Sequence, residues 1–457
     1  MSAPLSSRAF SPTCLGEARF ESPIQLSRQL GDGQTNYVSD DEQVMFDIEV
    51  SSRMPHVHSE DVALLEKAGP RERIFFDPKR VHAAIITCGG LCPGLNDVIR
   101  AIVMTLWQHY GVRRVSGFRH GYRGLLADTE YVPVPLDPKA VASIHRHGGT
   151  ILGSARGGGE RTGEIVDTLI RHSVDMLFTI GGDGTQRGAL KITEELERRR
   201  LPIAVVGVPK TIDNDLSFVE RSFGFETAVA EAVRAVDGAH TEATDAPHGV
   251  GLVKLMGRES GFIATHAALA SNEADFVLIP EVPFQLEGDN GFLRHLEHRI
   301  DKQGHAMVVV AEGAGQGFVP SDGTDAGGNR KLGDIGVFLQ NVIKEHFKER
   351  EKEISLKYID PSYTIRSQAA NPADSIYCAR LGSNAVHAAM SGRTACIVGM
   401  VNHRLVHVPI FAASAKRNCV DPEGPLWRDV IFNTGQPLMM LDKERREASR
   451  PRNEISL

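Results

Sequence analysis

The chain has 457 residues with a formal net charge of −7, and 41% of its residues are hydrophobic. This length is too great for one compact core and predicts two or three lobes. The negative charge offers no general attraction for nucleic acid, so an anionic ligand must be held by local Arg, Lys and backbone N–H groups. Apolar runs such as 203–208 are strand-sized, well short of the roughly 20 apolar residues that span a bilayer. We therefore expect a soluble globular protein.

Residues 1–80 show no sustained periodicity and carry Pro, Ser, Gly and acidic clusters. We expect an extension that embraces the body or a partner subunit, or else a disordered tail. The opening residues lack the pattern of a secretory signal, although their Ser-rich, acid-poor composition leaves a transit peptide open. The C-terminal residues 455–457 lack the basic middle residue of a peroxisomal tripeptide. Cytoplasm is the predicted location.

Six cysteines are scattered along the chain, at positions 14, 88, 92, 378, 396 and 419. Cys88 and Cys92 lie close together, but no second pair at metal-site spacing accompanies them. Both fall at a strand end and turn, so we interpret them as buried free thiols. This usage is typical of a reducing cytoplasm.

From residue 82 onward, β-rich apolar runs end in glycine turns and lead into amphipathic helical stretches. The run 82–88 leads into GGLCPG and a predicted helix over 95–110, and the run 174–180 leads into GGDG and a predicted helix over 185–200. Further strand-like runs follow at 203–209, 250–256, 275–281, 306–313 and 394–401. This alternation predicts an α/β fold with mainly parallel sheets and helices on both faces. Ligands of such sheets bind beyond the carboxyl ends of the strands, so we expect the site at the glycine turns.

The first glycine turn covers residues 88–94 and opens a helix. Its bare backbone and the free N–H groups of the helix can receive an anion. Steric demands of a strand-to-helix turn explain the same glycines equally well. The turn is neither a Walker loop nor a GxGxxG fingerprint.

The second turn, 181–185, places Asp183 among glycines at the start of the next helix. A carboxylate beside a phosphate cradle suits Mg²⁺ that bridges nucleotide oxygens. The alternative is that Asp183 only caps the helix. The same motif occurs in kinases that act on NAD and on lipids, so it predicts phosphoryl transfer to a hydroxyl without naming the acceptor.

The third segment, 209–215, contains two acids that flank an Asn directly after a strand. An Asx turn would explain this pattern. A kinase, however, needs a carboxylate to accept the proton of the acceptor hydroxyl. We predict Asp213 as this base, Asp215 as an accessory that holds substrate or metal-bound water, and Thr211 as an acceptor contact.

These segments resemble those of the phosphofructokinases. The motifs GGLCPGLNDVIR, LGSARGG, GGDGTQRGA, PKTIDND, LMGRESGF, AEG and PSYTIR stand in that family's order, over about residues 81–430. They are most similar to the longer ATP-dependent branch of plants, trypanosomatids and some bacteria. The resemblance implies two Rossmann-like lobes with mainly parallel sheets and flanking helices, plus the N-terminal extension. We expect a nucleotide-binding lobe from 81–225 with part of 366–430, and a sugar-phosphate lobe from 226–365 with part of 431–457.

The resemblance also implies the reaction and the role of each site residue. ATP would phosphorylate fructose 6-phosphate at its 1-hydroxyl, with Mg²⁺ on Asp183, Asp213 as base and Arg258 along the transferring group. The residues around ATP would be Gly90, Arg156, Gly157, Gly182, Asp183, Gly184 and Thr185. The residues around fructose 6-phosphate would be Thr211, Ile212, Asp213, Asp215, Met256, Gly257, Arg258, Glu312, Tyr363 and Arg366.

Several of these residues also have ordinary explanations. Arg156 and Arg258 can clamp phosphate oxygens bidentately, although an Arg is usually a surface ion pair. Met256 is more often a core residue than a ligand contact. Glu312 ends an apolar run, where an acid is costly unless it serves a ligand. Tyr363 stands where short bacterial relatives have His.

Two positions bear on the phosphoryl donor. Gly184 leaves room for a nucleotide, where pyrophosphate-using relatives have Asp. Lys210 is shared with the pyrophosphate users, but the long ATP-using branch has the same pair of residues, which favours ATP. The alternatives are a pyrophosphate-dependent phosphofructokinase and a catalytically silent regulatory subunit. The resemblance further implies a homotetramer or homodimer. In short relatives an Arg of the neighbouring subunit reaches the 6-phosphate; the approximately matching positions here are Gly249 and Lys357, so this contact is expected to be changed or lost, with Lys357 as a substitute point charge.

Overall fold

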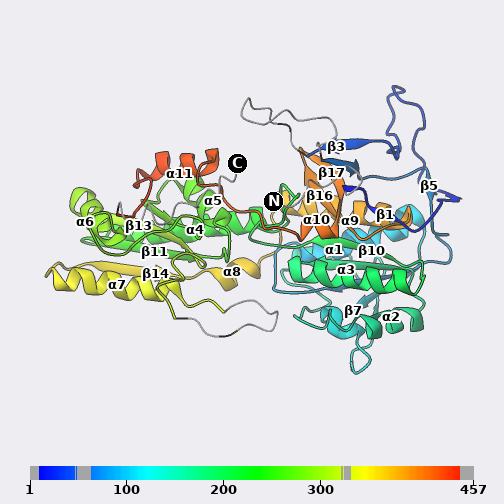
Figure 1. Cartoon of the computed structure of the whole chain (residues 1–457), viewed down its shortest axis with the longest axis horizontal. Coiled ribbons are helices and arrows are strands. Elements are labelled where there is room, and N and C mark those ends of the chain that lie inside the picture. Colours follow the sequence, from blue (N-terminus) through cyan, green and yellow to red (C-terminus); the bar gives the residue numbers. More distant parts are fainter. Residues whose placement is uncertain (1–9, 47, 49–62, 321–322, 324–330, 443–457) are drawn as a thin grey trace, which may run out of the picture. The chain divides into compact units, whose positions relative to one another are not determined.

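The structure is a computed structural model that describes residues 10–46, 48, 63–320, 323 and 331–442. The chain divides into two compact units (Figure 1). Unit 1 contains Met1–Thr227 and Arg366–Asn418, and unit 2 contains Ala228–Ile365 and Cys419–Leu457. Within the described ranges, every helix is too short or too polar to cross a membrane.

Unit 1 is built on a nine-stranded sheet in the order β3-β4-β17-β16-β10-β9-β6-β7-β8. The central strands from β16 to β7 are parallel, whereas β17, β4, β3 and β8 pair antiparallel with their neighbours. The strands are β3 Gln43–Met45, β4 Leu64–Lys67, β6 His82–Thr87, β7 Arg114–Phe118, β8 Val134–Pro135, β9 Met176–Gly181, β10 Ala204–Pro209, β16 Cys396–Val401 and β17 Arg404–Pro409. Phe178 of β9 lies opposite both Ile85 of β6 and Val206 of β10. This common register makes β6, β9 and β10 end at the same edge.

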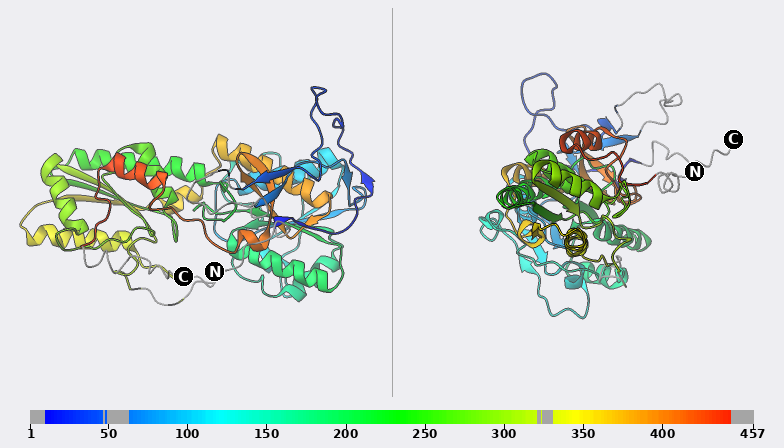
Figure 2. Two further views of the ribbon diagram at one scale, coloured as in Figure 1. Left: turned by 45° about the horizontal axis from the view of Figure 1, so that its top comes forward. Right: turned by 90° about the vertical axis from the view of Figure 1, so that its left-hand side faces the viewer.

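Helices cover both faces of this sheet (Figure 2). Ile85 shares one core with the apolar residues of α1 and α9, and Ile86 shares the other with those of α2 and α3, because successive strand side chains point to opposite faces. The helices are α1 Leu95–Met104, α2 Thr162–Arg171, α3 Asp183–Arg198, α9 Pro372–Met390 and α10 Ile410–Ala413, with 3₁₀ turns η3 Gly121–Leu125 and η4 Ile144–Arg146. The predicted helix over 95–110 is α-helical only to Met104 and continues as a π-helix, η2 Thr105–Tyr110.

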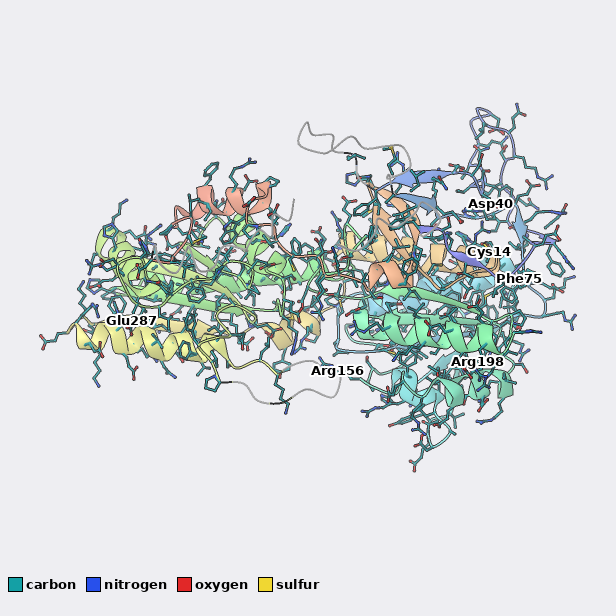
Figure 3. All side chains as sticks on the ribbon, in the orientation of Figure 1. Cys14, Asp40, Phe75, Arg156, Arg198 and Glu287 are labelled. Atoms are coloured by element: carbon teal, nitrogen blue, oxygen red, sulfur yellow. The ribbon has the colours of Figure 1, made fainter. Side chains whose placement is uncertain are left out.

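The described N-terminal residues pair with the body of unit 1. β1 (Thr13–Cys14) pairs with β15 (Arg393–Thr394), β2 (Phe20–Glu21) pairs with β5 (Arg73–Ile74), and β3 and β4 extend the large sheet. Two buried arginines hold this region in place. Arg71 and Arg393 each form ion pairs with Glu66 and with Asp40, which is labelled in Figure 3. An embrace of a partner subunit stays a prediction.

Unit 2 is built on a parallel four-stranded sheet in the order β12-β13-β11-β14. Its strands are β11 Gly249–Leu255, β12 Phe276–Leu278, β13 His305–Ala311 and β14 Ser355–Ile359. The helices are α4 Phe225–Thr244, α5 Phe262–Ser271, α6 Phe292–Gln303, α7 Ile335–Glu349, α8 Ser362–Arg366 and α11 Pro425–Thr434. The unit boundaries at 227/228 and 365/366 fall within α4 and α8. A Cβ at Gly249 would collide with the carbonyl oxygen of Ala243, so this glycine lets α4 pack closely on the sheet.

The predicted α/β class, with parallel central strands and flanking helices, is confirmed. The sequence also predicts a Gly-rich surface loop over 315–333, of which residues 321–322 and 324–330 lie outside the described part of the chain.

Candidate active site

The three predicted turns lie together at the carboxyl edge of β6, β9 and β10. Backbone hydrogen bonds connect them: Cys88 N–H donates to Ile180 O at 2.9 Å, and Lys210 N–H donates to Gly181 O at 3.0 Å. Residues far apart in the sequence are thereby fixed at one site, as expected of an open α/β sheet.

The first turn has the geometry of a strand-to-helix junction. Gly94 adopts φ +97° before α1, and a Cβ there would lie 2.5 Å from Cys378 Sγ, so only glycine fits. Gly90 lies in more open space, where a Cβ would lie 4.0 Å from Arg366 Nη1. Steric demands therefore explain Gly94 but not Gly90. Gly90 has Arg366 as a near neighbour.

Cys88 and Cys92 are buried thiols, as predicted. Burial raises the pKa of each to about 12, so neither forms a thiolate at neutral pH.

Arg156 and Gly157 lie in a segment that runs beside the first turn. Ala155 pairs with Cys88 and accepts a 3.0 Å hydrogen bond from Gly89 N–H, and Ser154 Oγ donates to Gly89 O at 2.6 Å. Arg156 is exposed (Figure 3). Its guanidinium is therefore accessible to a ligand at this edge.

Asp183 begins α3 directly after β9. Gly182 is the N-cap residue, and no side chain makes a capping hydrogen bond, which argues against a pure capping role. Asp183 Oδ2 accepts a hydrogen bond from Arg187, whereas Oδ1 is buried and has no hydrogen-bond partner among the residues described. A carboxylate oxygen left in this state fits a cation.

The surroundings of Asp183 also bear on the identity of the cation. Clusters of three or more His, Cys, Asp or Glu that could bind a metal are absent from the described ranges. Mg²⁺ typically binds through one or two carboxylates together with substrate phosphates, so Asp183 fits this mode. A Cβ at Gly184 would find its nearest atom, Arg187 Nη2, at 3.9 Å, which leaves room beside Asp183.

The third segment is a turn organised by its own side chains. Thr211 Oγ1 donates to Asp215 Oδ1 at 2.5 Å and accepts from Asp213 N–H at 3.3 Å. Asn214, at φ +57°, accepts from Ser222 N–H at 2.8 Å, a partner eight residues on, so this hydrogen bond is not that of an Asx turn, which closes two residues on. The two acids keep carboxylate oxygens that this turn does not use.

Lys210 connects the third segment with the first. Its side chain is buried, with 7% of the residue exposed, and Nζ donates a 2.7 Å hydrogen bond to Gly90 O. Desolvation lowers the pKa of this ammonium below its usual value.

Unit 2 carries the predicted sugar-phosphate residues at the ends of two neighbouring strands. Met256, Gly257 and Arg258 follow β11, and Glu312 follows β13. The two loops are joined because Glu312 N–H donates to Leu255 O at 2.8 Å and Gly313 N–H donates to Gly257 O at 3.0 Å. Met256 is buried, as a core residue would be. Tyr363 lies on α8 and is 80% exposed.

Arg417 was not predicted from the sequence. It lies after α10, and its guanidinium is 3.6 Å from Asp215 Oδ2 and 3.9 Å from Asp183 Oδ2. Its segment has neither a glycine turn nor a strand end, so only the tertiary pairing reveals it.

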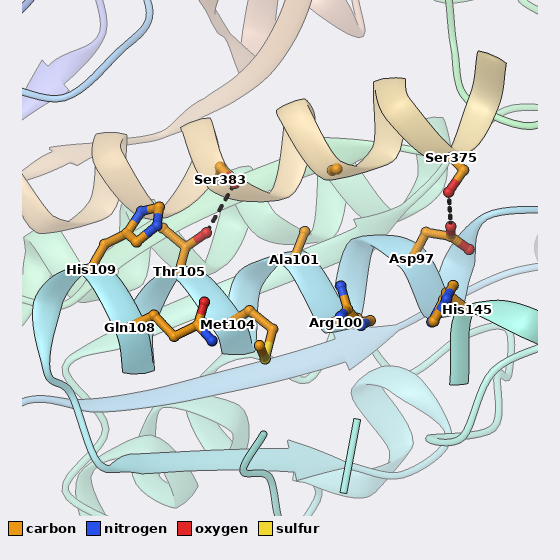
Figure 4. A pocket seen from close by; sticks show the side chains of 11 residues that line it. Asp97, Arg100, Ala101, Met104, Thr105, Gln108, His109, His145, Ser375 and Ser383 are labelled. Atoms are coloured by element: carbon orange, nitrogen blue, oxygen red, sulfur yellow. Dashed lines mark hydrogen bonds between the residues drawn. The ribbon is translucent and has the colours of Figure 1, made fainter. Parts of the chain in front are cut away.

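A pocket of about 220 Å³ lies elsewhere in unit 1, between α9 and the continuous helix of α1 and η2 (Figure 4). Hydrogen bonds from Ser375 to Asp97 and between Thr105 and Ser383 join its walls. None of the predicted site residues lines it.

A family model described as phosphofructokinase matches residues 82–389. The chain belongs to the phosphofructokinase family. An ATP-dependent 6-phosphofructokinase of Borreliella burgdorferi is 52% identical over 93% of this chain and 96% of the relative. The chloroplastic ATP-dependent 6-phosphofructokinase 5 of Arabidopsis thaliana is 50% identical over 82% of this chain and 69% of its own. The ATP-dependent 6-phosphofructokinase of Trypanosoma cruzi is 49% identical over 82% of this chain and 78% of the relative.

Solved phosphofructokinases share the fold. The Pichia pastoris enzyme in the T-state matches with a TM-score of 0.61 and 22% identity, over 86% of this chain and 40% of that chain. A pyrophosphate-dependent phosphofructokinase of Marinobacter aquaeolei matches with a TM-score of 0.64 and 20% identity, over 78% of this chain and 91% of that chain. The relatives of bacterial, plant and trypanosomatid origin confirm the predicted long branch of the family.

Proposed function

We propose that this protein is an ATP-dependent 6-phosphofructokinase of glycolysis. It transfers the γ-phosphoryl group of ATP to the 1-hydroxyl of fructose 6-phosphate and yields fructose 1,6-bisphosphate and ADP. The main support for this proposal is that the three turns lie together at one edge of the sheet. The chain is also 52% identical to a relative named ATP-dependent 6-phosphofructokinase.

ATP is favoured over pyrophosphate as the donor. The open space at Gly184 accommodates a nucleotide beside Asp183, where a second carboxylate would repel the α-phosphate. Lys210 is occupied by its hydrogen bond to Gly90, so its presence is compatible with ATP.

The donor side of the reaction falls to the residues of unit 1. Gly90, Arg156, Gly157 and residues 182–185 surround the nucleotide, because the bare turns and the start of α3 offer backbone N–H groups to phosphates. Asp183, whose Oδ1 has no hydrogen-bond partner among the described residues, would hold Mg²⁺. When bound, this ion neutralises charge on the transferring phosphates.

The acceptor side needs a base and a cation. The 1-hydroxyl oxygen bonds to the γ-phosphorus as the bond from that phosphorus to ADP breaks, and Asp213 takes the hydroxyl proton. Arg258 stabilises charge on the transferring group. Thr211, Ile212 and Asp215 position the acceptor hydroxyl.

The remaining acceptor contacts hold the sugar phosphate. Met256 and Gly257 lie along the sugar phosphate, Glu312 accepts hydrogen bonds from the sugar hydroxyls, and Tyr363 and Arg366 hold the 6-phosphate. Arg366 is the stronger candidate because a guanidinium forms bidentate bonds to phosphate. Tyr363, which is exposed, supplies a phenolic hydroxyl.

We further propose a homotetramer or homodimer in the cytoplasm. In such an assembly, the contact that short relatives make with the 6-phosphate through an Arg of the neighbouring subunit is changed in this chain. The matching positions are Gly249 and Lys357. Gly249 is buried against α4, and Lys357 Nζ lies 3.6 Å from Glu242 Oε2. The partly exposed Lys357 supplies a point charge at most.

A coupled assay with fructose 6-phosphate tests the function directly. ATP and pyrophosphate are compared side by side with Mg²⁺ present, and AMP is added to probe an effector. We expect product with ATP and essentially none with pyrophosphate. Equal rates with the two donors would contradict the ATP assignment, and no product with either would favour the silent regulatory subunit.

A further inference from the structure

The segment after α10 pairs with the loop that carries Asp213. Arg417 forms an antiparallel bridge with Leu216, Asn418 N–H donates to Asp215 O at 2.9 Å, and Ser217 Oγ donates to Lys416 O at 2.7 Å. Backbone hydrogen bonds therefore fix where the Arg417 side chain begins.

The Arg417 guanidinium lies between two carboxylates from different turns. Nη1 is 3.6 Å from Asp215 Oδ2 and Nη2 is 3.9 Å from Asp183 Oδ2. Two carboxylates brought to one site repel each other, and a cation between them offsets this repulsion. Arg is suited to the position because its planar fork presents separate N–H groups to separate partners.

The neighbouring cations do not share this arrangement. Arg187 also contacts Asp183, but its side chain is 50% exposed on α3, against 28% for Arg417. Exposed ion pairs of that kind contribute little. Lys416 is exposed and contacts the loop only through its carbonyl oxygen among the hydrogen bonds of the described residues. Replacing its side chain therefore removes one positive charge next to Arg417 and serves as a matched control.

Of these two carboxylates, Asp183 keeps the fewer contacts when Arg417 is replaced. Asp215 keeps the hydrogen bond from Thr211 and the backbone bond from Asn418 whatever residue stands at 417. Asp183 retains only the exposed Arg187 among the ion pairs recorded for the described residues. The carboxylate then depends on the hydrogen bond that Arg187 donates to Oδ2, so the direction of Oδ1, which has no hydrogen-bond partner among the described residues, is less constrained.

We propose that Arg417 is a positioning residue of the phosphoryl-donor site. It holds Asp183 beside Asp215 so that the free oxygen of Asp183 stays directed at the metal and phosphates of the donor. The proposal rests on the proposed function, because it gives the phosphoryl donor to this edge of unit 1. It concerns a residue outside every motif that identified the family.

The test compares Arg417→Gln with Lys416→Gln in the full-length protein. Binding of the non-hydrolysable analogue AMP-PNP with Mg²⁺ is measured by calorimetry, and the KM values for ATP and fructose 6-phosphate are measured separately. We expect Arg417→Gln to weaken AMP-PNP binding and raise the KM for ATP at least about fivefold, while the KM for fructose 6-phosphate changes less than twofold. Lys416→Gln stays within twofold of the parent in all three. Arg417→Lys keeps the positive charge but loses the planar guanidinium. Its AMP-PNP affinity and its KM for ATP should lie between those of the parent and those of Arg417→Gln.

Two results would overturn the proposal. One is AMP-PNP binding by Arg417→Gln within twofold of Lys416→Gln, and the other is equal weakening for both substrates. A thermal melt checks the fold, and if Arg417→Gln is unfolded, Arg417→Lys decides by the same criteria. The unsubstituted protein is assayed first, so an inactive parent refutes the proposed function, whereas an active parent with an unaffected variant refutes only the role of Arg417.

Discussion

The ammonium of Lys210 donates a 2.7 Å hydrogen bond to the carbonyl oxygen of Gly90. This contact ties the segment after β10 to the first glycine turn, which is separated from it by β9 in the sheet. The proposed acceptor loop and the proposed nucleotide turn are therefore mechanically linked through one buried side chain.

Lys210→Met tests this link. Methionine of similar length fills the space, so the fold should be retained, and removal of a desolvated charge can even stabilise it. Loss of a charged hydrogen bond, about 1.5–3 kcal/mol, should loosen the Gly90 turn and lower kcat/KM for ATP by about tenfold or more. Steady-state kinetics and a thermal melt are the measurements. Unchanged kinetics with ATP would show that the turn holds without the lysine.

Gly184→Asp tests donor selection. The added carboxylate stands next to Asp183 and repels the nucleotide phosphates, so ATP use should fall far more than binding of fructose 6-phosphate. Gly184→Ala is the matched control, because its Cβ meets no atom closer than 3.9 Å and should be tolerated. ATP activity in the Asp variant equal to that of the Ala variant would refute this explanation of specificity.

Asp213→Asn tests the proposed base. The amide cannot accept the hydroxyl proton, and turnover should fall at least about a hundredfold, the usual scale for loss of such a group. The substitution keeps the size of the side chain, so the melting temperature should change little. Single-turnover and steady-state rates at saturating substrates measure the effect. Near-normal turnover would mean that another residue takes the proton.

His387 on α9 should make unit 1 sensitive to mild acid. The residue is buried with Nδ1 2.8 Å from the hydroxyl oxygen of Tyr110, and burial lowers its pKa from 6.5 to about 3. Between these values the unfolded chain binds a proton that the folded state does not, so the free energy of unfolding falls as the pH falls. The loss is about 2 kcal/mol between pH 6.5 and 5.

Urea unfolding at pH 7 and pH 5 measures this effect. His387→Gln keeps a hydrogen-bonding partner for Tyr110 but cannot titrate, so its midpoint should fall less on acidification than that of the parent. His147→Gln removes an exposed histidine of unit 1 and serves as the control. The control should show the same pH dependence as the parent. The prediction is wrong if His387→Gln does so too.

Much of the fold was predictable because the central strands are apolar on both faces. The predicted ends of β6, β9, β10, β11 and β13 agree with the structure to within two residues. The N-terminal strands β1 to β5 were not recognisable, since each has two to four residues and depends on a partner distant in the sequence. The antiparallel edge strands β3, β4 and β8 of the large sheet were missed for the same reason, whereas β17 was missed although it has six residues and follows β16 after a two-residue turn.

The site was predictable where its residues follow a strand. Asp183 and Asp213 stand in turns whose glycine and acid pattern is local, and the structure brings both turns to one edge. Arg417 could not be found this way, because its partner Leu216 lies about 200 positions earlier and no local pattern records that pairing. The roles assigned to the predicted residues stay predictions until the substitutions are measured.

The division of unit 1 into two chain segments has a consequence for its synthesis on the ribosome. β10 lies between β9 and β16 in the finished sheet, yet β16 is made only after the whole first segment of unit 2. Until Cys396–Val401 emerge, the nascent chain carries an apolar strand whose N–H and C=O groups have an open edge. Such an edge can pair with another unfinished chain, so folding of unit 1 must wait for its own late strand, and premature termination before residue 396 should yield insoluble product.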